Sequence, residues 1–517
     1  MRLFSSGRVF VIMVDVHWAD AIAGALCEVG NGDSHVVASG ITPSGEIHIG
    51  NMREVVTADA VYRALEDRGT DVRLIYIADT FDPLRTVYPF LPETYREEVG
   101  KPLFKIPCPC GDHDNYAEHF LEPFLESLEL LEIDAEILRA DELYESGEYR
   151  GAILRALEEE ESIARILEET SHRSLPGGWS PFNPLCPECE RIVGTRVLGF
   201  NSEEESVDVA CTCGFQGVVS VVGGGKLTWR VDWPARWEIL GVTVEPFGKD
   251  HATRGGSYDT GKRIAEEVYR YRAPYPIIYE WIMLKGKGAM HSSKGVLISI
   301  TEMLEVLPPE VLRYLIIRSK PEKHIEFDPG IPLLNLIDEY DRRANPRAHE
   351  LSQTKRAEDT AIPFRHLVTA VQVTRETDAL LGILERSGYD TSDSRAVLAR
   401  AENAQRWVER YAPPNLKFKV YKELPQAVRS FDSIERELLG VLAKEIKGWK
   451  TPQEIHDGIY KIAKETGIEP KRFFQTIYTT LLSAKSGPRL GYFLASLDND
   501  FLVKRFNQAA NSQSDSN

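Results

Sequence analysis

The amino-acid sequence predicts an α/β fold in which a parallel sheet is interrupted by an insertion and followed by an all-helical region. Two apolar, strand-like segments at 36–38 and 72–77 flank a helical segment at 51–66. This order is the repeating unit of a parallel, doubly wound sheet. Six of the seven cysteines fall between residues 108 and 213, which marks the insertion. From about residue 301 onward the sequence has the periodicity of amphipathic helices.

The order of these segments sets the expected domain boundaries. The first strand runs into the turn-prone segment 39–45, and Gly69 ends the helix before the second strand. A further strand is expected at 277–279, after the insertion. We expect a disordered extension at 1–12, the two halves of a Rossmann-like sheet domain at 13–105 and 229–300, an insertion at 106–228, a linker region at 301–350, a helical domain at 351–506 and a disordered tail at 507–517.

Length and composition indicate an ordinary globular protein of several domains. A chain of 517 residues is too long for one hydrophobic core. Its hydrophobic share of 43% and charged share of 27% are typical of soluble proteins. No apolar run approaches the roughly 20 residues that cross a bilayer, and the apolar segment 9–14 is too short for a signal peptide. We therefore expect a cytoplasmic protein with no membrane partner.

Charge is distributed unevenly along the chain. The net charge is −18, yet residues 351–517 hold 25 basic and 21 acidic side chains. This difference favours a polyanionic partner for the C-terminal part, although chance variation between two domains would also produce it. Aromatic residues there suit the stacking of single-stranded RNA bases, or they form the helical core. The aromatic residues in question are Trp407, Tyr411, Phe418 and Phe473.

The segment His48-Ile49-Gly50-Asn51 stands where a strand's loop enters a helix. The amides of a helix N-terminus attract phosphate oxygens. His48 and Asn51 can donate hydrogen bonds to phosphates, and Gly50 lets a base lie against the backbone. A second segment, Met290-His291-Ser292-Ser293-Lys294-Gly295, offers hydroxyls and an ammonium to a leaving pyrophosphate. Together the two segments predict an ATP site that activates a carboxylic acid.

These two segments resemble the signature motifs of class I aminoacyl-tRNA synthetases, and residues 42–51 resemble the version found in class I lysyl-tRNA synthetases. Similar matches occur at 229–237, 248–251, 279–281 and 491–493. The resemblance runs over nearly the whole chain. It implies a class I catalytic domain of the Rossmann type, a helical anticodon-binding region, and tRNA(Lys), L-lysine and ATP as partners. It also implies nucleotide contacts from Gly248, Asp250, His251, Met290, Ser292 and Ser293.

The second motif departs from the family pattern at two positions. Ala289 stands where the family has a lysine, and His291 replaces a usual serine. Lys294, which matches the second loop lysine, is present. The resemblance implies that lysine attacks ATP to give lysyl-adenylate, with Mg²⁺ sharing the phosphate charge, before the adenylate reacts with a ribose hydroxyl of tRNA. His48, Asn51 and Lys294 would act by positioning and charge stabilisation.

A lysine pocket needs carboxylates, aromatic rings and hydroxyls. A buried ammonium must be paired, and aromatic rings attract it by roughly 0.5–2 kcal/mol. Residues of this kind near the expected strand ends are Asp232, Trp233, Trp237, Tyr279 and Glu280, with Asp232 or Glu280 as partner of the side-chain ammonium. The family resemblance points to Gly40, Thr42, Trp233, His251 and Tyr279 as substrate contacts. Tryptophans that simply fill the core are the alternative.

Two groups of residues have the spacing of structural zinc sites. Cys186, Cys189, Cys211 and Cys213 form two close pairs, as in four-thiolate zinc sites. The other group follows from the family resemblance, which suggests ligands at Cys108, Asp112, His113 and His119. Because the family has aspartate and cysteine exchanged here, Cys110 is an alternative to Asp112. We expect one or two structural Zn²⁺ ions.

Two other functions remain open at this point. One is a class I synthetase for another amino acid, of the glutamate or cysteine type. The other is an inactive RNA-binding paralogue, because the signature loop departs from the family at Ala289 and His291.

Overall fold

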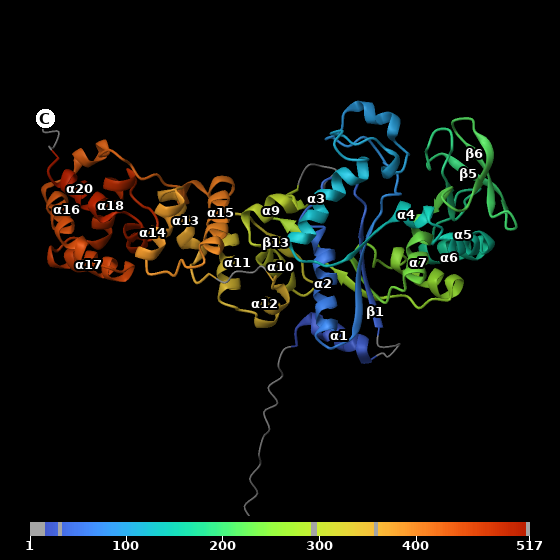
Figure 1. Ribbon diagram of the computed structural model, residues 1–517, viewed down its shortest axis with the longest axis horizontal. Helices are drawn as coiled ribbons and strands as arrows, with labels where there is room; N and C mark the ends of the chain where they lie inside the picture. Colours follow the sequence, from blue (N-terminus) through green and yellow to red (C-terminus); the bar gives the residue numbers. More distant parts are fainter. Residues whose placement is uncertain (1–15, 29–33, 291–296, 356–359, 513–517) are drawn as a thin grey trace, which may run out of the picture. The chain divides into compact units, whose positions relative to one another are not determined.

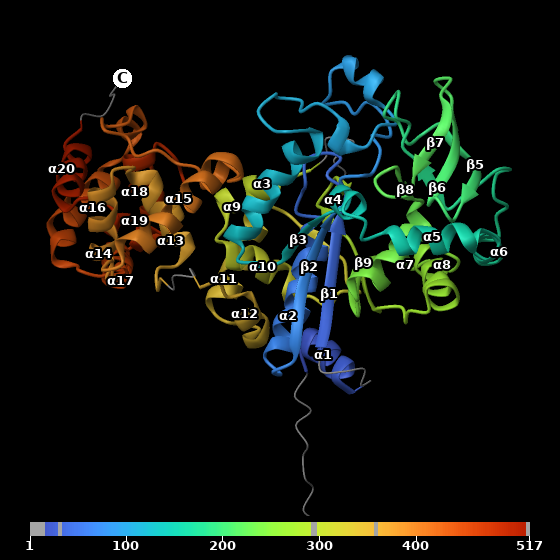
Figure 2. The same ribbon diagram turned by 45° about the vertical axis from the view of Figure 1, so that its right-hand side comes forward.

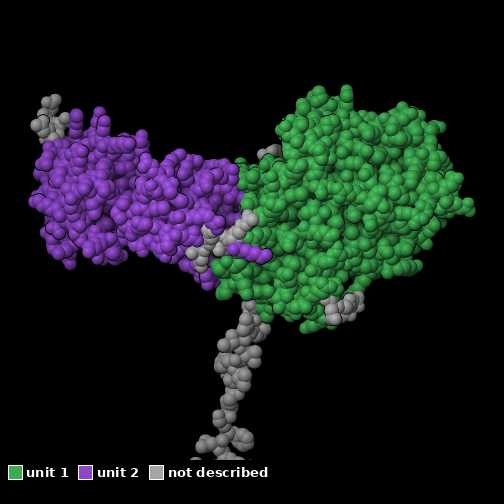
Figure 3. All heavy atoms as spheres, in the orientation of Figure 1, with its two compact units in different colours: residues 1–303, 312–327, 345–354 green, residues 304–311, 328–344, 355–517 purple. Residues whose placement is uncertain are grey.

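The computed structural model describes residues 16–28, 34–290, 297–355 and 360–512. The chain forms two compact units, which Figure 3 shows in different colours. The first unit contains the described residues up to 303 together with 312–327 and 345–354, and the second contains 304–311, 328–344 and the described residues from 355 onward. The predicted extension at 1–12 lies outside the described residues.

The first unit is built on a five-stranded parallel sheet with the strand order β10-β9-β1-β2-β3 (Figures 1 and 2). The chain runs from β1 outward through β2 to β3 and then returns on the other side of β1 through β9 to β10. The order of strands therefore reverses between β1 and β9. In sheets of this kind ligands bind outside the carboxyl ends of the strands at that point. The strands are β1 (Ser34–Ile41), β2 (Asp71–Ala78), β3 (Glu136–Arg139), β9 (Val244–Gly248) and β10 (Tyr275–Tyr279).

Burial explains why these segments are strands. Five consecutive residues of β1 and the last five of β2 are buried, as expected for parallel strands covered on both faces. The strands predicted at 36–38, 72–77 and 277–279 lie inside β1, β2 and β10, and the Rossmann-like fold class is confirmed. The helix predicted from 51 is α2 (Met52–Glu66), which leads from β1 to β2.

The range 106–228 is only partly an insertion, because β3 belongs to the main sheet. β3 pairs with β2. It has only four residues, and so short a segment did not reveal a strand in the sequence. The helices of this range are α3 (Tyr116–Leu130), α4 (Ala140–Glu145), α5 (Arg150–Glu158) and α6 (Glu160–Ser171). Its remaining strands form the pair β4 (Phe182–Pro184) and β8 (Gly225–Leu227), and the antiparallel sheet β5 (Thr195–Asn201), β6 (Ser206–Cys211) and β7 (Gln216–Ser220).

Shorter elements complete the first unit. After the insertion come α7 (Trp229–Leu240), α8 (Ser257–Ile264) and the π-helical turn η3 (Ala265–Tyr269). A small sheet contains β11 (Ile282–Leu284), β12 (Gly288–Ala289) and β13 (Ile325–Phe327). Fully buried Arg313 pairs with Asp59 of α2 and donates to the carbonyls of Leu131, Leu351 and Ser352. The remaining elements are α1 (Trp18–Glu28), η1 (Glu93–Glu98), η2 (Leu103–Lys105) and α12 (Pro346–Ser352), together with parts of α9 (Ile300–Val306) and α10 (Pro309–Ile317), whose residues 304–311 belong to the second unit.

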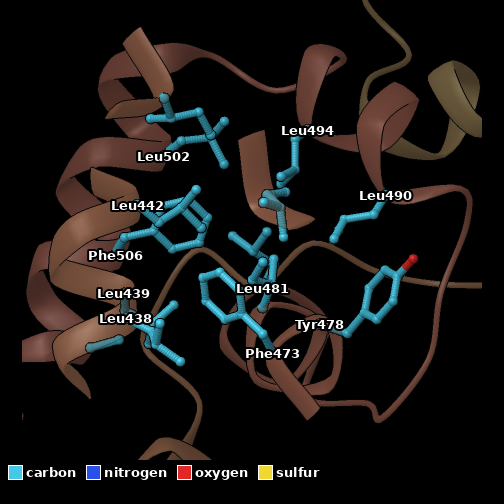
Figure 4. Packing of buried hydrophobic residues seen from close by; sticks show 14 of the residues in the cluster. Leu438, Leu439, Leu442, Phe473, Tyr478, Leu481, Leu490, Leu494, Leu502 and Phe506 are labelled. Atoms are coloured by element: carbon cyan, nitrogen blue, oxygen red, sulfur yellow. The ribbon is translucent and has the colours of Figure 1, made fainter. Parts of the chain in front are cut away.

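The second unit is helical, as predicted. Its core is a cluster of leucine, isoleucine and phenylalanine side chains from the last helices of the chain, part of which Figure 4 shows. The described elements are α11 (Ile331–Asp341), α13 (Phe364–Val373), α14 (Thr377–Arg386), α15 (Ser394–Arg410), η5 (Pro414–Leu416), η6 (Gln426–Ser430), α16 (Ser433–Glu445), η7 (Ile446–Gly448), α17 (Pro452–Glu465), α18 (Pro470–Leu482), α19 (Leu490–Ala495) and α20 (Asn499–Ala510).

The structure decides two sequence-based expectations for this unit. Trp407 and Phe473 are fully buried, so for these two residues the core alternative is correct and they cannot serve as exposed stacking platforms. The disordered tail was expected from 507, but residues 507–510 belong to α20 and Ala509 is buried. No helix in the described part of the chain is long and apolar enough to span a bilayer.

Candidate active site

A cavity of about 450 Å³ lies in the first unit at the carboxyl ends of β1, β9 and β10. The last residues of these strands, Ile41, Gly248 and Tyr279, all line it. This is the place where the reversal of strand order predicts a ligand site. Further lining residues come from the start of α2, from the loops after β1, β2 and β9, and from the region of β11 and β12: Ser44, His48, Gly50, Asn51, Glu54, Tyr88, Phe90, Asp250, His251, Trp281, Ile282, Ala289 and Met290.

The nucleotide motif folds back on itself at the entrance to α2. The backbone N–H of Gly50 donates to Nδ1 of His48 at 3.1 Å. In a neutral imidazole only one nitrogen carries a proton, so Nε2 of His48 is the donor. A Cβ at position 50 would lie 2.8 Å from the His48 ring, which explains why glycine stands there. The motif therefore presents an imidazole N–H at the wall of the cavity.

Asn51 is oriented by the same turn. Its side-chain Oδ1 accepts the backbone N–H of His48 at 3.1 Å, so its amide NH₂ is the end that can donate to a ligand. Met290, the first residue of the second signature segment, lines the same cavity. The chain after the segment returns to the first motif, because the N–H of Ile49 donates to the carbonyl of Ile298. The predicted residues His291, Ser292, Ser293, Lys294 and Gly295 lie outside the described residues.

All predicted nucleotide contacts that the structure describes line this one cavity. His48, Gly50 and Asn51 come from the entrance to α2, whereas Gly248, Asp250 and His251 follow β9. A Cβ on Gly248 would lie 2.5 Å from Oδ1 of Asp250, so the Asp250 side chain would have to move if a larger residue stood there. The two motifs, about 200 residues apart in the sequence, are brought together because β1 and β9 are neighbours in the sheet.

The cavity contains a carboxylate that the sequence analysis missed. Glu54 lies in the first turn of α2 and lines the cavity. Its Oε1 accepts the N–H of Gly40 at 2.9 Å, and its Oε2 accepts the hydroxyl of Tyr279 at 2.7 Å. Burial raises the pKa of Glu54 to about 8. In the described part of the chain no lysine or arginine forms a salt bridge with it, so this carboxylate is suited to a cationic ligand.

One signal in the sequence pointed to Glu54. It follows Asn51 by three residues, one helical turn beyond the nucleotide motif, where a side chain returns to the same face of the helix. Tyr279 and His251, both predicted as lysine contacts, also line the cavity. Gly40 is linked to the cavity indirectly, because its backbone N–H donates to Glu54. The hydroxyl of Thr42 donates to Asp82 at 2.9 Å.

Asp232 does not face the cavity, which corrects its assignment as a lysine contact. It is fully buried, accepts the hydroxyl of Tyr144 at 2.6 Å and pairs with Arg236 at 2.8 Å. Arg236 also pairs with Asp79. The carboxylate of Asp232 is thus neutralised within a buried network just after the insertion, because α7 turns this face inward.

Trp233 and Glu280 also lie outside the cavity wall. Trp233 is 3% exposed and donates its indole N–H to Glu245, which also accepts from Trp237 at 2.6 Å. Glu280 pairs with Lys249 at 2.7 Å on a partly exposed surface. The tryptophans are therefore core residues held by one buried carboxylate, whose pKa burial raises to about 7.

The first metal-binding candidate consists of Cys108, Cys110, His113 and His119. The sulfur of Cys110 lies 3.2 Å from Nδ1 of each histidine, and Cys108 lies 3.4 and 3.5 Å from the same atoms. Zinc–ligand bonds of about 2.0–2.3 Å in a tetrahedron separate ligands by roughly 3.5 Å, so this set fits Zn²⁺. Asp112 is not in the group, which favours the alternative ligand Cys110.

The second candidate consists of the four predicted cysteines. Cys186 and Cys213 are 3.6 Å apart, as are Cys189 and Cys211, and all four sulfurs lie within 4.8 Å of one another. Four thiolates at this spacing fit a tetrahedral structural zinc site. None of these ligands lines the cavity at the strand ends, so a bound zinc ion would lie outside it.

Elemental analysis of the purified protein is expected to find two zinc ions per chain, one for each group of ligands. Cys110→Ser should reduce the content to one, because it removes a ligand of the first group. Asp112→Ala is the matched control and should retain two. Loss of zinc in the Asp112 variant, with full retention in the Cys110 variant, would reverse the ligand assignment.

Comparison with known proteins agrees with this geometry. Residues 16–367 match the family model described as tRNA synthetases class I (K). The chain is 53% identical to lysine–tRNA ligase 1 of Methanosarcina acetivorans, over 96% of this chain and 98% of the relative. It is 52% identical to the lysine–tRNA ligase of Methanosarcina barkeri, with the same coverage, and 50% identical to that of Archaeoglobus fulgidus, over 96% and 100%.

These matches cover the sheet domain, the insertion and the helical region together. Three observations therefore lead to one assignment: the two signature segments, the reversal of strand order, and a family model that spans most of the chain. The chain belongs to the class I tRNA synthetases of the K family.

Proposed function

We propose that this chain ligates L-lysine to tRNA(Lys), using ATP and a lysyl-adenylate intermediate. Glu54 is the observation that carries the proposal: it is a carboxylate at the wall of the cavity, without a cationic partner among the described residues. Glutamate as substrate would need a basic group at that place. The curated relatives named as lysine–tRNA ligases support the same substrate.

In this proposal the side-chain ammonium of lysine binds Glu54 and the ring of Tyr279 forms the adjoining wall. Lysine's carboxylate must reach the α-phosphorus of ATP near His48, so its charged end group points the other way, toward Glu54. The two hydrogen bonds that Glu54 accepts fix the direction of its carboxylate. A preformed acceptor loses little conformational entropy on binding.

ATP would occupy the side of the cavity formed by His48, Gly50, Asn51, Gly248 and Asp250. Nε2–H of His48 and the amide of Asn51 would donate to phosphate oxygens as negative charge develops during attack on the α-phosphorus. Lys294 would neutralise the pyrophosphate. Mg²⁺ bound with ATP would share the phosphate charge. No protein nucleophile is needed, since the lysine carboxylate attacks ATP directly and the ribose hydroxyl then attacks the acyl carbon.

The aromatic residues Tyr88 and Phe90 form another wall of the same cavity. Their rings are stacked with centroids 5.5 Å apart, and Phe90 is 45% exposed. With ATP and lysine bound as proposed above, this wall would receive the terminal adenosine of the tRNA, because the ribose of that adenosine must approach the adenylate. Exposed rings bind unpaired bases by stacking.

Phe90→Ala is expected to slow transfer of lysine to tRNA about 10-fold, since stacking contributes roughly 1–3 kcal/mol per base. Lysine-dependent ATP–pyrophosphate exchange, which needs no tRNA, should stay unchanged. Single-turnover transfer from preformed adenylate measures the effect. Tyr275→Ala, which removes an exposed ring outside the cavity wall, is the control. An equal loss in exchange would mean that Phe90 serves ATP or lysine instead.

ATP–pyrophosphate exchange measured with each amino acid in turn tests the proposed function. Exchange that depends on lysine is expected. Exchange with glutamate or cysteine alone, or with no amino acid, would contradict the proposal. We place the reaction in the cytoplasm, because the cysteines form no disulfides and paired free thiols are typical of reducing compartments.

A further inference from the structure

A buried carboxyl group on β9 has no part in the reaction proposed above. Glu245 is 7% exposed and lies three residues before Gly248, the end of β9, which lines the catalytic cavity. In the described part of the chain no lysine or arginine forms a salt bridge with it. A buried polar group is unfavourable unless hydrogen bonds compensate for the lost water, so the donors that surround Glu245 indicate what it does.

Two indole rings donate to this carboxyl group. Nε1 of Trp233 lies 3.1 and 3.0 Å from the two oxygens, and Nε1 of Trp237 lies 2.6 Å from Oε2. Both tryptophans belong to α7 and are four residues apart, so Glu245 joins one face of α7 to β9. An indole has a single N–H donor, and its hydrogen bond therefore fixes how the ring is rotated in the core.

Trp233 carries this orientation to the wall of the catalytic cavity. Its ring stacks on that of Trp229, with centroids 5.4 Å apart and planes inclined by 13°. The ring of His251, which lines the cavity, lies 5.5 Å from Trp233 and 6.0 Å from Trp229. Aromatic pairs at these centroid distances attract one another in preferred orientations. His251 thus rests on two tryptophan rings, one of which is bonded to Glu245.

Trp237 has the same bond but no such route to the cavity. Its ring lies 5.1 Å from that of Trp233 and 6.0 Å from that of Tyr258, and neither Trp237 nor Tyr258 lines the cavity. Trp233 is 3% exposed and Trp237 is 1% exposed. The two tryptophans therefore share donor, acceptor and burial, and they differ in whether they contact a residue of the cavity wall.

His251 stands near the side of the cavity where lysine is proposed to bind. It follows β9 by three residues, and Tyr279, the wall of the lysine side, ends the neighbouring strand β10. The backbone N–H of His251 donates to the carbonyl of Gly248 at 3.0 Å. Its Nε2 lies 3.7 Å from Oδ2 of Asp250, which is too far for a hydrogen bond. Packing against the tryptophans therefore decides the direction of the His251 ring.

We propose that Glu245 is a positioning residue for lysine binding: it holds Trp233 in the orientation on which the ring of His251 rests. Glu245 is absent from the cavity wall, so it acts only through these rings. The proposal rests on the proposed function, which supplies lysine as the ligand. It gives a role in the site to a carboxyl group outside the residues predicted from the sequence.

Isothermal titration calorimetry with lysine, on the full-length protein, tests the proposal. Glu245→Leu removes both acceptor oxygens and is expected to raise the dissociation constant for lysine about 10-fold, because slight misplacement of a site residue can cost as much as about 100-fold. Glu245→Gln keeps one acceptor oxygen for the indoles and should lose less. Unchanged lysine affinity in Glu245→Leu would overturn the proposal.

The two tryptophans provide a matched pair of variants. Trp233→Phe should raise the dissociation constant for lysine about 10-fold, whereas Trp237→Phe should leave it unchanged. Each variant removes one buried indole and one hydrogen bond to Glu245, so both should lower the midpoint of thermal unfolding by a similar amount. A purely structural role would affect lysine binding equally in both variants, and that result would contradict the proposal.

A double-mutant cycle asks whether Glu245 acts through His251. His251→Ala removes the last ring of the chain of contacts, and in that background Glu245→Leu should cause no further loss of lysine affinity. Independent residues have additive effects, whereas residues linked by a shared partner do not. Additive losses would overturn the proposal. So would an equal loss of affinity for ATP and for lysine in Glu245→Leu, since that would show general damage to the fold.

The two proposals can fail separately. Pyrophosphate exchange by the wild-type protein that does not depend on lysine would contradict the proposed function, whatever the Glu245 variants do. Lysine-dependent exchange by the wild type, together with unchanged lysine affinity in Glu245→Leu, would remove the positioning role alone.

Discussion

Replacement of Glu54 by glutamine is expected to raise the dissociation constant for lysine about 100-fold. Removing one partner of a buried, hydrogen-bonded charge pair typically costs about 2–5 kcal/mol. The variant keeps the shape of the side chain: its amide oxygen can still accept the N–H of Gly40, and its NH₂ can donate to the hydroxyl oxygen of Tyr279. Isothermal titration calorimetry with lysine measures the change, and lysine-dependent pyrophosphate exchange should show the same rise in KM.

The same residue predicts a pH dependence. The pKa of Glu54 is raised to about 8 in the free protein, so the carboxyl is largely protonated at pH 7. The ammonium group of bound lysine favours the deprotonated form of Glu54, so lysine binding must release a proton. Lysine affinity should increase as the pH rises from 6.5 to 8.5. Calorimetry in two buffers with different ionisation enthalpies should detect nearly one proton released at pH 7, and none in Glu54→Gln.

Two controls separate this role from a general effect. Glu280→Gln removes a carboxylate that pairs with Lys249 outside the cavity wall, and it should leave lysine affinity unchanged. Norleucine, which lacks the side-chain ammonium, should bind the wild type poorly and the Glu54 variant no worse. If Glu280→Gln lost affinity while Glu54→Gln did not, the assignment of the lysine partner would be wrong.

His48→Ala is expected to lower the rate of lysine-dependent pyrophosphate exchange by about 100- to 1,000-fold, the range for loss of one donor to transition-state charge. The expectation follows from the turn that fixes Nε2 of His48 as the donor at the cavity wall. Affinity for ATP should change much less than the rate, because the charge develops during attack. Rapid-quench measurement of adenylate formation separates the two quantities.

His324→Ala is a suitable control, since this exposed histidine lies outside the cavity. It should retain wild-type exchange. Gly50→Ala offers an independent test, because a Cβ there would lie 2.8 Å from the His48 ring and displace it. A His48 variant with wild-type rates would show that the motif serves the fold alone.

The nucleotide side of the site could be predicted from the sequence because its residues are close together along the chain. The turn from His48 to Asn51 is formed by hydrogen bonds between residues no more than three positions apart. The parallel sheet was predictable for a similar reason, since each buried strand appears as a continuous apolar run. The four cysteines of the second metal group also lie close together along the chain, between positions 186 and 213.

The lysine-binding side of the site depends on contacts between residues that are far apart in the sequence. Glu54 is held by Gly40, 14 residues away, and by Tyr279, 225 residues away. Asp232 had equally suitable chemistry, but helix α7 turns it toward Tyr144 and Arg236, which neutralise it in the interior. The sequence by itself thus determined the fold class, the nucleotide motif and the types of residue that a lysine site needs. Only the tertiary structure decided which carboxylate faces the cavity, because burial and pairing are set by neighbours that the sequence places far away.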